Sequence, residues 1–215
     1  MTDVRYGIFL RPDAATCWTV TQITFALKQQ FGLVSAGAFP PHATIIGNFR
    51  TEASQDELIA VLDDVFAGVQ PLTVYNSGIE RNSDRYGFNL NLNESATDVN
   101  RSLEKVARRV SDAVEPLCAP PDPPDLLTPG PADYSFAAHL SLAAHELAID
   151  NRLSDEIGEF LEGLPITPPA SFTARWYSLF EFRADWSSYW WEHMTWRHLR
   201  SWDVSASRDT GSHGD

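Results

Sequence analysis

The apolar pattern of this chain runs twice through the same order of secondary-structure elements. After a strand predicted at 4–12, the periodicities predict a helix, a strand, a helix and two strands within residues 14–93. The same five elements follow within residues 98–203. The two halves share this order of elements but not their amino-acid sequence, so the pattern predicts a duplicated α+β fold.

The residue ranges of the predicted elements follow from the spacing of apolar residues and from the turn-forming residues between the elements. In the first half they are a helix at 14–31, a strand at 42–49, a helix after Ser54 and strands at 72–80 and 85–93. In the second half they are a helix at 99–114, a strand at 137–145, a helix capped by Asp150 and strands at 171–184 and 190–204. The clearest start signal is Ser54 with Glu57, the spacing of a capping box.

Each half carries a histidine in its first strand, at the equivalent place in the element order. The motif H-x-[ST] occurs at 42–44 and again at 139–141. Chance predicts about one such match in a chain of this composition, so a single match carries no weight. A third match at 193–195 falls in the last predicted strand and has no counterpart in the first half. We therefore treat the first two as a pair and keep His193 and Thr195 in reserve.

The geometry of a strand gives this pair a chemical meaning. Side chains alternate between faces, so His42 and Thr44 share one side of their strand at a separation of about 7 Å, and His139 and Ser141 do the same. Imidazole can accept or donate a proton near neutral pH, and a hydroxyl can donate a hydrogen bond to a phosphate oxygen as charge develops there. Two such strands can hold one phosphate from both sides.

The alternative for either histidine alone is an ordinary strand residue with a satisfied ring, which is the commoner case. The repetition in equivalent positions favours a site. The remaining histidines, His145, His198 and His213, are expected to be structural.

Paired H-x-[ST]-apolar motifs, one in each half of a duplicated α+β chain, resemble the two-histidine (2H) phosphoesterase superfamily, nearest to its 2′-5′ RNA ligase-like branch. The tetrads are His42-Ala43-Thr44-Ile45 and His139-Leu140-Ser141-Leu142, and the likeness in element order covers most of residues 4–203. The resemblance implies two antiparallel sheets that flank a central cleft, with helices outside. It also implies metal-independent chemistry on 2′,3′-cyclic phosphates or 2′-5′ phosphodiesters.

The resemblance further implies a role for each residue. His42 is expected to be the general acid and His139 the general base, while Thr44 and Ser141 hold the phosphate. The sequence itself does not distinguish the two histidine roles. Residues 1–203 are expected to form one bilobal domain, a monomer, and 204–215 a flexible tail.

The charge of the chain limits its partners. With 16 Lys and Arg against 29 Asp and Glu, the formal net charge is −13. Such a surface repels a polyanion and lacks the basic footprint of a protein that binds long nucleic acid. We expect a small phosphodiester or nucleotide substrate, or at most a short RNA.

Other sequence signals indicate neither cofactor nor membrane. Cys17 and Cys118 have no disulfide or zinc spacing, no phosphate-binding glycine loop is present, and no carboxylates cluster with metal-ligand spacing. We therefore predict no metal and no cofactor. The N-terminus has no basic segment followed by an apolar run, so the expected location is the cytoplasm, without a membrane anchor.

Secondary candidates surround the two motifs. Phe49, Tyr134 and Phe136 are candidates for stacking on a nucleobase, although shielding from solvent explains them equally well. An arginine is expected near the phosphate, and the candidates on or beside predicted strands are Arg81, Arg85, Arg183 and Arg197. Residues 116–131 hold seven of the 14 prolines and are predicted to be a stiff connection or, alternatively, a lid over the site.

Three functions remain open at this point. The first is a phosphodiesterase that acts on small cyclic phosphates or short 2′-5′ linked oligonucleotides. The second is a tRNA-directed 2′-5′ ligase or nuclease of the same fold, which needs a basic stripe. The third is a binding module that holds a phosphate or nucleotide without turning it over.

Overall fold

A computed structural model describes residues 3–82, 86–95, 98–119 and 136–205. Tyr134, Arg85, most of the proline-rich segment and the tail from 206 lie outside these residues. The helices are α1 (Ala14–Phe31), α2 (Gln55–Phe66), α3 (Arg101–Val114), α4 (His145–Ile149), α5 (Ser154–Gly163) and α6 (Trp190–His193), with short 3₁₀ turns η1 (Ser35–Gly37) and η2 (Glu115–Leu117). Within the described residues, no helix is long and apolar enough to cross a membrane.

One antiparallel sheet, here called sheet A, has four strands. They are β1 (Asp3–Arg11), β2 (Ala43–Phe49), β8 (Trp176–Ala184) and β9 (Thr195–Asp203), in the order β2-β1-β8-β9. In its register Phe9 lies opposite Thr44 on one side and opposite Ser178 on the other. The sheet therefore joins the first histidine strand to the last two strands of the chain.

The remaining strands form what we call sheet B. They are β3 (Leu72–Tyr75), β4 (Ile79–Arg81), β5 (Phe88–Asn91), β6 (His139–Ala143) and β7 (Ser171–Ala174). The ladders β4-β5-β6 and β3-β7 are formally separate, and a bridge between Tyr75 and Asn93 connects them. All the pairings are antiparallel, so the expectation of two antiparallel sheets holds, with sheet B interrupted at 76–78.

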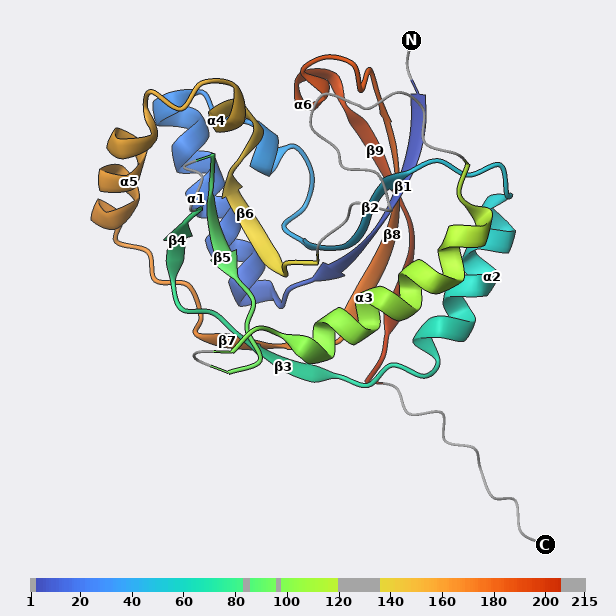
Figure 1. Ribbon diagram of the computed structural model, residues 1–215. Helices are drawn as coiled ribbons and strands as arrows, with labels where there is room; N and C mark the ends of the chain where they lie inside the picture. The colour runs from blue at the N-terminus through green and yellow to red at the C-terminus, as the bar shows by residue number, and fades with distance from the viewer. Residues whose placement is uncertain (1–2, 83–85, 96–97, 120–135, 206–215) are drawn as a thin grey trace, which may run out of the picture.

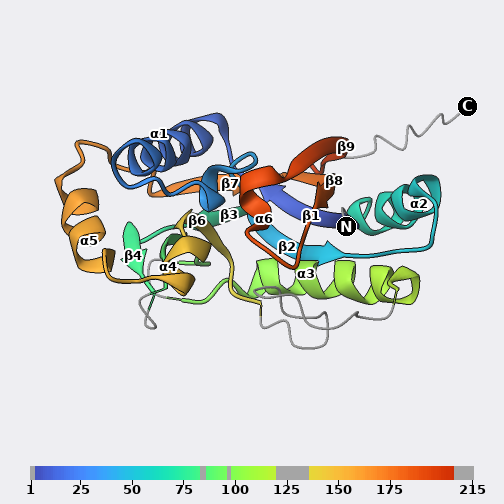
Figure 2. The ribbon, with the colours of Figure 1, turned by 90° about the horizontal axis from the view of Figure 1, so that it is seen from above.

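Helices cover the outer side of each sheet. Some of them pack on the sheet that does not contain the strand preceding them in the chain. Helices α2 and α3 lie beside sheet A, whereas α1 and α5 lie beside sheet B (Figures 1 and 2). Helix α1 follows β1 of sheet A but packs near β6, and α3 follows β5 of sheet B but packs near β2. Each lobe, defined as a sheet with its helices, therefore contains residues of both halves.

Successive side chains of a strand point to opposite sides, so each sheet has one side that packs in the main core and one side that faces away from it. In sheet B the row of Leu90 and Leu140 is buried in the main core, whereas the adjacent row of Asn89 and Ser141 points to the opposite side. In sheet A, Ile8 and Leu179 pack in the same main core, and Phe9 points to the other side. We call the side turned away from the main core the inner side of each sheet.

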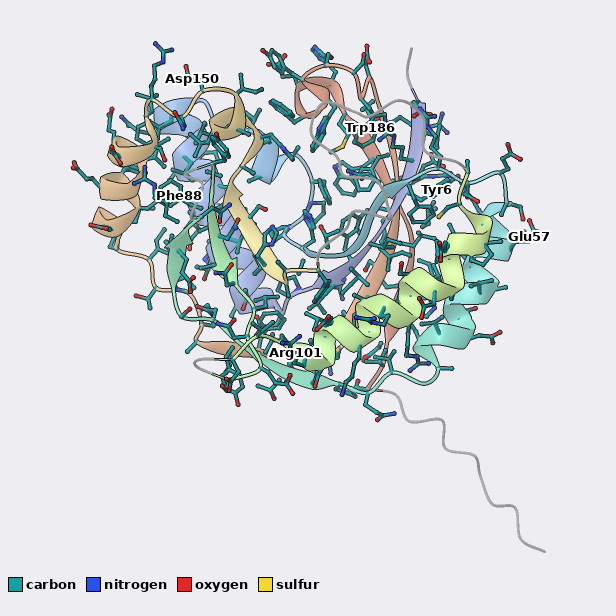
Figure 3. All side chains as sticks on the ribbon, in the orientation of Figure 1. Tyr6, Glu57, Phe88, Arg101, Asp150 and Trp186 are labelled. Atoms are coloured by element: carbon teal, nitrogen blue, oxygen red, sulfur yellow. The ribbon has the colours of Figure 1, made fainter. Side chains whose placement is uncertain are left out.

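Several predicted boundaries are corrected by the structure. The predicted strand at 190–204 begins with a helix, α6, because Trp190 and Trp191 are buried in an aromatic cluster with Trp186. Figure 3 labels Trp186 near α6. The strand at 72–80 is split into β3 and β4, and the strand at 171–184 is split into β7 and β8.

Helix starts were predicted with mixed success. The capping box is confirmed, because Ser54 accepts from Glu57 N and the Glu57 side chain accepts from Ser54 N. Asp150 does not cap the start of α5, which begins only at Ser154; it ends α4 instead, and its carboxylate accepts from Arg152. Val99 is exposed and precedes α3, whose cap is Asn100.

Candidate active site

The two histidine strands approach each other where the lobes meet. Strands β2 and β6 have Cα atoms within 8 Å of each other, although they belong to different sheets. His42 immediately precedes β2 and His139 is the first residue of β6. Burial is the main cause that lowers the pKa of His42, and the charge of His139 makes a smaller contribution in the same direction, so the two histidines lie close enough to interact.

The two imidazole rings are held in the same way. Nδ1 of His42 lies 2.9 Å from the carbonyl oxygen of Pro40, and Nδ1 of His139 lies 2.7 Å from that of Ala137. In both cases the carbonyl lies two residues upstream. A carbonyl can only accept, so Nδ1 carries the proton and Nε2 of each neutral ring is left to take up or deliver a proton.

Aromatic residues enclose the His42 ring. Phe39 stacks on it with ring centroids 4.1 Å apart at an angle of 22°, and Phe9 meets it edge-on at 4.7 Å. Phe9 belongs to β1, directly opposite Thr44, and Phe39 comes from the loop that leads into β2. The first histidine therefore lies in an apolar environment that neighbouring strands and the preceding loop create together.

This environment shifts the protonation of both histidines. Burial lowers the pKa of His42 to about 4, against a smaller rise from the hydrogen bond to Pro40. Burial also lowers the pKa of His139, and the hydrogen bond to Ala137 opposes the change. Both shifts favour the uncharged ring at neutral pH, and an anion close to the rings would raise both pKa values.

The two hydroxyl residues lie where the strand pattern predicts them. Ser141 is half-buried and shares the inner side of sheet B with His139, opposite Asn89 of β5. Thr44 is half-buried and shares a row of sheet A with Phe9, the residue whose ring touches His42. Each histidine thus has one hydroxyl two residues further along its own strand.

Several other candidates lie elsewhere. Phe49 is 3% exposed in the main core and contacts Tyr6, so its interpretation as a base-stacking residue is wrong. Phe136 packs partly buried against the same core. The side chain of His193 is 83% exposed at the end of α6, and Thr195 begins β9, the edge strand of sheet A opposite to β2.

The described candidate arginines do not meet the histidines. Arg81 pairs with Asp155 at 2.8 Å and lines a cavity of about 620 Å³ between β4 and α5, in the row of Phe88. Arg183 and Arg197 both pair with the buried carboxylate of Glu181, at 3.1 Å. Within the described residues, the expected arginine beside the phosphate is not found among these three.

Sequence reasoning missed the polar residues beside the second motif. Asn91 lies opposite His139, and Asn89 lies opposite Ser141 with Glu80 on its other side. The signal was present in the sequence, because residues 88–93 read FNLNLN, with asparagine at every second position. No group of three or more His, Cys, Asp or Glu side chains suited to a metal ion occurs in the part of the chain that the structure describes.

Comparison with known proteins identifies the fold. No protein-family model matches the sequence, and no curated protein matches it. Among solved structures, TT0787 of Thermus thermophilus superposes with a TM-score of 0.59 at 12% identity, over 94% of this chain and 98% of that chain. A structure described as a phosphoesterase gives 0.54 at 13% identity, and E. coli LigT complexed with NADP⁺ gives 0.52 at 12%, each over 94% of this chain and 98% of the other.

The chain has the LigT-like fold. This confirms the α+β class and the arrangement of antiparallel sheets with helices outside. At 12–13% identity the likeness is one of fold, so the chemistry of this LigT-like chain has to be argued from its own residues.

Proposed function

We propose that this chain is a 2H phosphoesterase, a metal-independent phosphodiesterase that acts on 2′,3′-cyclic phosphates or 2′-5′ linkages of nucleotides or short oligonucleotides. The observation that carries the proposal is the equivalence of the two motifs in space. Each histidine donates from Nδ1 to a carbonyl two residues upstream, and each has a hydroxyl residue two positions downstream. Such symmetry is expected when two strands serve one phosphate.

Hydrolysis of a phosphodiester needs two proton transfers. One histidine takes a proton from water as its oxygen attacks phosphorus, and the other delivers a proton to the ribose oxygen that leaves. Thr44 and Ser141 donate hydrogen bonds to the non-bridging oxygens, on which negative charge builds in the transition state. The product is a phosphate monoester, and in the ligating direction the two histidines exchange roles.

Burial lowers the pKa of both His42 and His139, so the electrostatics act in the same direction on the two rings. We keep the roles that the family resemblance implies, with His42 as the general acid and His139 as the general base.

The fold comparison supports a nucleotide as substrate. LigT from E. coli, which has the same fold, was solved in complex with NADP⁺, a nucleotide. The net charge of −13 favours a small ligand over long RNA, and disfavours the tRNA-directed alternative.

The experiment that tests the proposal is hydrolysis of 2′,3′-cyclic nucleotides and of a 2′-5′ linked dinucleotide in the presence of EDTA. We expect His42→Ala and His139→Ala each to lower kcat by about 10²- to 10⁴-fold, the usual contribution of a general acid or base. His193→Ala is the matched control and is expected to keep full activity, because its side chain is exposed on α6.

Other outcomes would reject the proposal. Activity that EDTA abolishes would indicate a metal-dependent enzyme. Nucleotide binding without turnover in the native protein would support the binding-module alternative. Equal activity in all four proteins would mean that the two motifs are ordinary strand residues.

A further inference from the structure

The inner side of sheet B carries polar side chains beside His139 and Ser141 that the proposed chemistry does not use. One row pairs Asn91 with His139, and the other runs Glu80, Asn89, Ser141 across β4, β5 and β6. The row between them, Ile79, Leu90, Leu140, packs against the core. Since opposite residues of antiparallel strands share a face, Glu80 and Asn91 lie on the same side of the sheet as the catalytic pair His139 and Ser141.

Hydrogen bonds fix which atoms these rows present. The Asn91 amide nitrogen Nδ2 donates to Glu80 Oε2 at 2.6 Å, and the Asn89 Nδ2 donates to Asn82 Oδ1 at 2.6 Å. Ser77 Oγ donates to the other Glu80 oxygen, Oε1. A carboxylate has about four acceptor positions, so Glu80 keeps capacity for further donors, and the Asn91 Oδ1 is an additional acceptor.

The inner side of sheet A is mainly aromatic. Phe9, Phe180 and Phe182 occupy it and are each at most 8% exposed. Phe39, Trp190 and Trp191 pack with them in a second apolar cluster. On β9, Trp196 lies opposite Phe182 and His198 lies opposite Phe180, and both side chains are exposed. Sheet A therefore offers an aromatic surface, whereas the carboxylate and amide groups that could pair with the edge of a base lie on sheet B.

The distances suit a nucleotide. Adjacent strands are about 4.8 Å apart, so Glu80 on β4 lies roughly 10 Å across the sheet from Ser141 on β6. This is about the reach from the phosphate of a nucleotide to the far edge of its base. The separation also keeps the carboxylate of Glu80 away from the phosphate, whose charge it would repel.

We propose that Glu80, oriented by Asn91 and Ser77, reads the base of the substrate and selects guanine. The proposal rests on the proposed function, because it takes a nucleotide phosphate to lie between the histidines. Guanine presents N1–H and the 2-amino group side by side, and these donors match the two oxygens of one carboxylate. Uracil and hypoxanthine present a single ring N–H, which is flanked by acceptors or by carbon. In adenine and cytosine, the amino group lies next to a ring nitrogen that is an acceptor.

Binding of guanosine 3′-monophosphate and inosine 3′-monophosphate by calorimetry tests this selection, since the two differ only in the 2-amino group. We expect the native protein to bind the guanosine compound about tenfold or more tightly, the usual effect of one hydrogen bond to a charged group. Glu80→Gln is expected to remove this preference while inosine binding persists. Glu159→Gln, an exposed glutamate on α5 in the same lobe, is the matched control and should retain the preference.

The outcomes separate this inference from the proposed function. Equal binding of the two nucleotides by the native protein overturns base reading by Glu80, and hydrolysis of cyclic nucleotides can still stand. A guanosine preference that survives in Glu80→Gln also overturns it. If neither nucleotide binds, this inference fails, and hydrolysis of the cyclic nucleotides decides the proposed function separately.

Discussion

Among individual side chains, His42 couples the stability of the protein to pH. Its pKa is about 4 in the folded chain, against 6.5 for an unperturbed histidine. Between these values the unfolded chain binds a proton that the folded chain does not, so the free energy of unfolding falls as pH falls from about 6.5 towards 4. Above about pH 6.5 the stability that depends on an uncharged His42 is fully present.

The prediction concerns the variant His42→Gln, which cannot take up this proton. On moving from pH 7.5 to pH 5, we expect the native protein to lose about 1 kcal/mol more stability than the variant, allowing for the partial exposure of the ring. Urea denaturation at both pH values measures this difference. Equal losses in the two proteins would mean that the folded chain does not depress the pKa of His42.

Residues of the proposed site could be named from the sequence only where a pattern was repeated. His42, Thr44, His139 and Ser141 could be named because the same motif occurs in equivalent slots of both halves. Phe49 was misjudged because proximity in sequence says nothing about which side of a strand is buried.

Among secondary-structure elements, the short α4 fixes the loop that leads to His42. Glu146 of α4 accepts hydrogen bonds from the backbone N–H groups of Val34 and Ser35, at 2.7 and 2.6 Å, and from the Ser35 hydroxyl. This loop continues through η1 to Phe39, which stacks on the His42 ring. Glu146 therefore connects the segment after the second histidine strand to the segment before the first.

We predict that Glu146→Ala lowers stability by about 2–3 kcal/mol, because it leaves backbone donors without an acceptor. Looser packing of Phe39 should also expose His42 and raise its pKa towards 6.5, which an NMR titration of the ring would detect. Glu146→Gln, which keeps one acceptor oxygen, should have intermediate effects. A loss of stability with an unchanged titration of His42 would restrict Glu146 to a purely structural role.

Element prediction succeeded where local signals were strong. The capping box of α2 depends only on neighbouring residues, so the sequence was sufficient. The helix α6 was read as strand because tryptophan favours strands, while its actual conformation is set by burial of Trp190 and Trp191 in a cluster formed by distant segments.

At the scale of the whole molecule, the two lobes are interleaved. The repeat was visible in the sequence, but the exchange of α1 and α3 between the lobes was not, because it depends on contacts between residues far apart in the chain. This exchange brings β2 and β6 from different sheets together. The paired site is therefore a property of the complete fold and of neither half alone.

The central claim is that His42 and His139 act on one phosphate as a unit. The most direct measurement is a double-mutant cycle of kcat/KM for a 2′,3′-cyclic nucleotide with His42→Ala, His139→Ala and the double variant. Groups that work in the same transition state are strongly non-additive, so we predict that the double variant is within about tenfold of either single variant. A double variant whose loss equals the product of the two single losses would show that the histidines act independently, and would contradict the account.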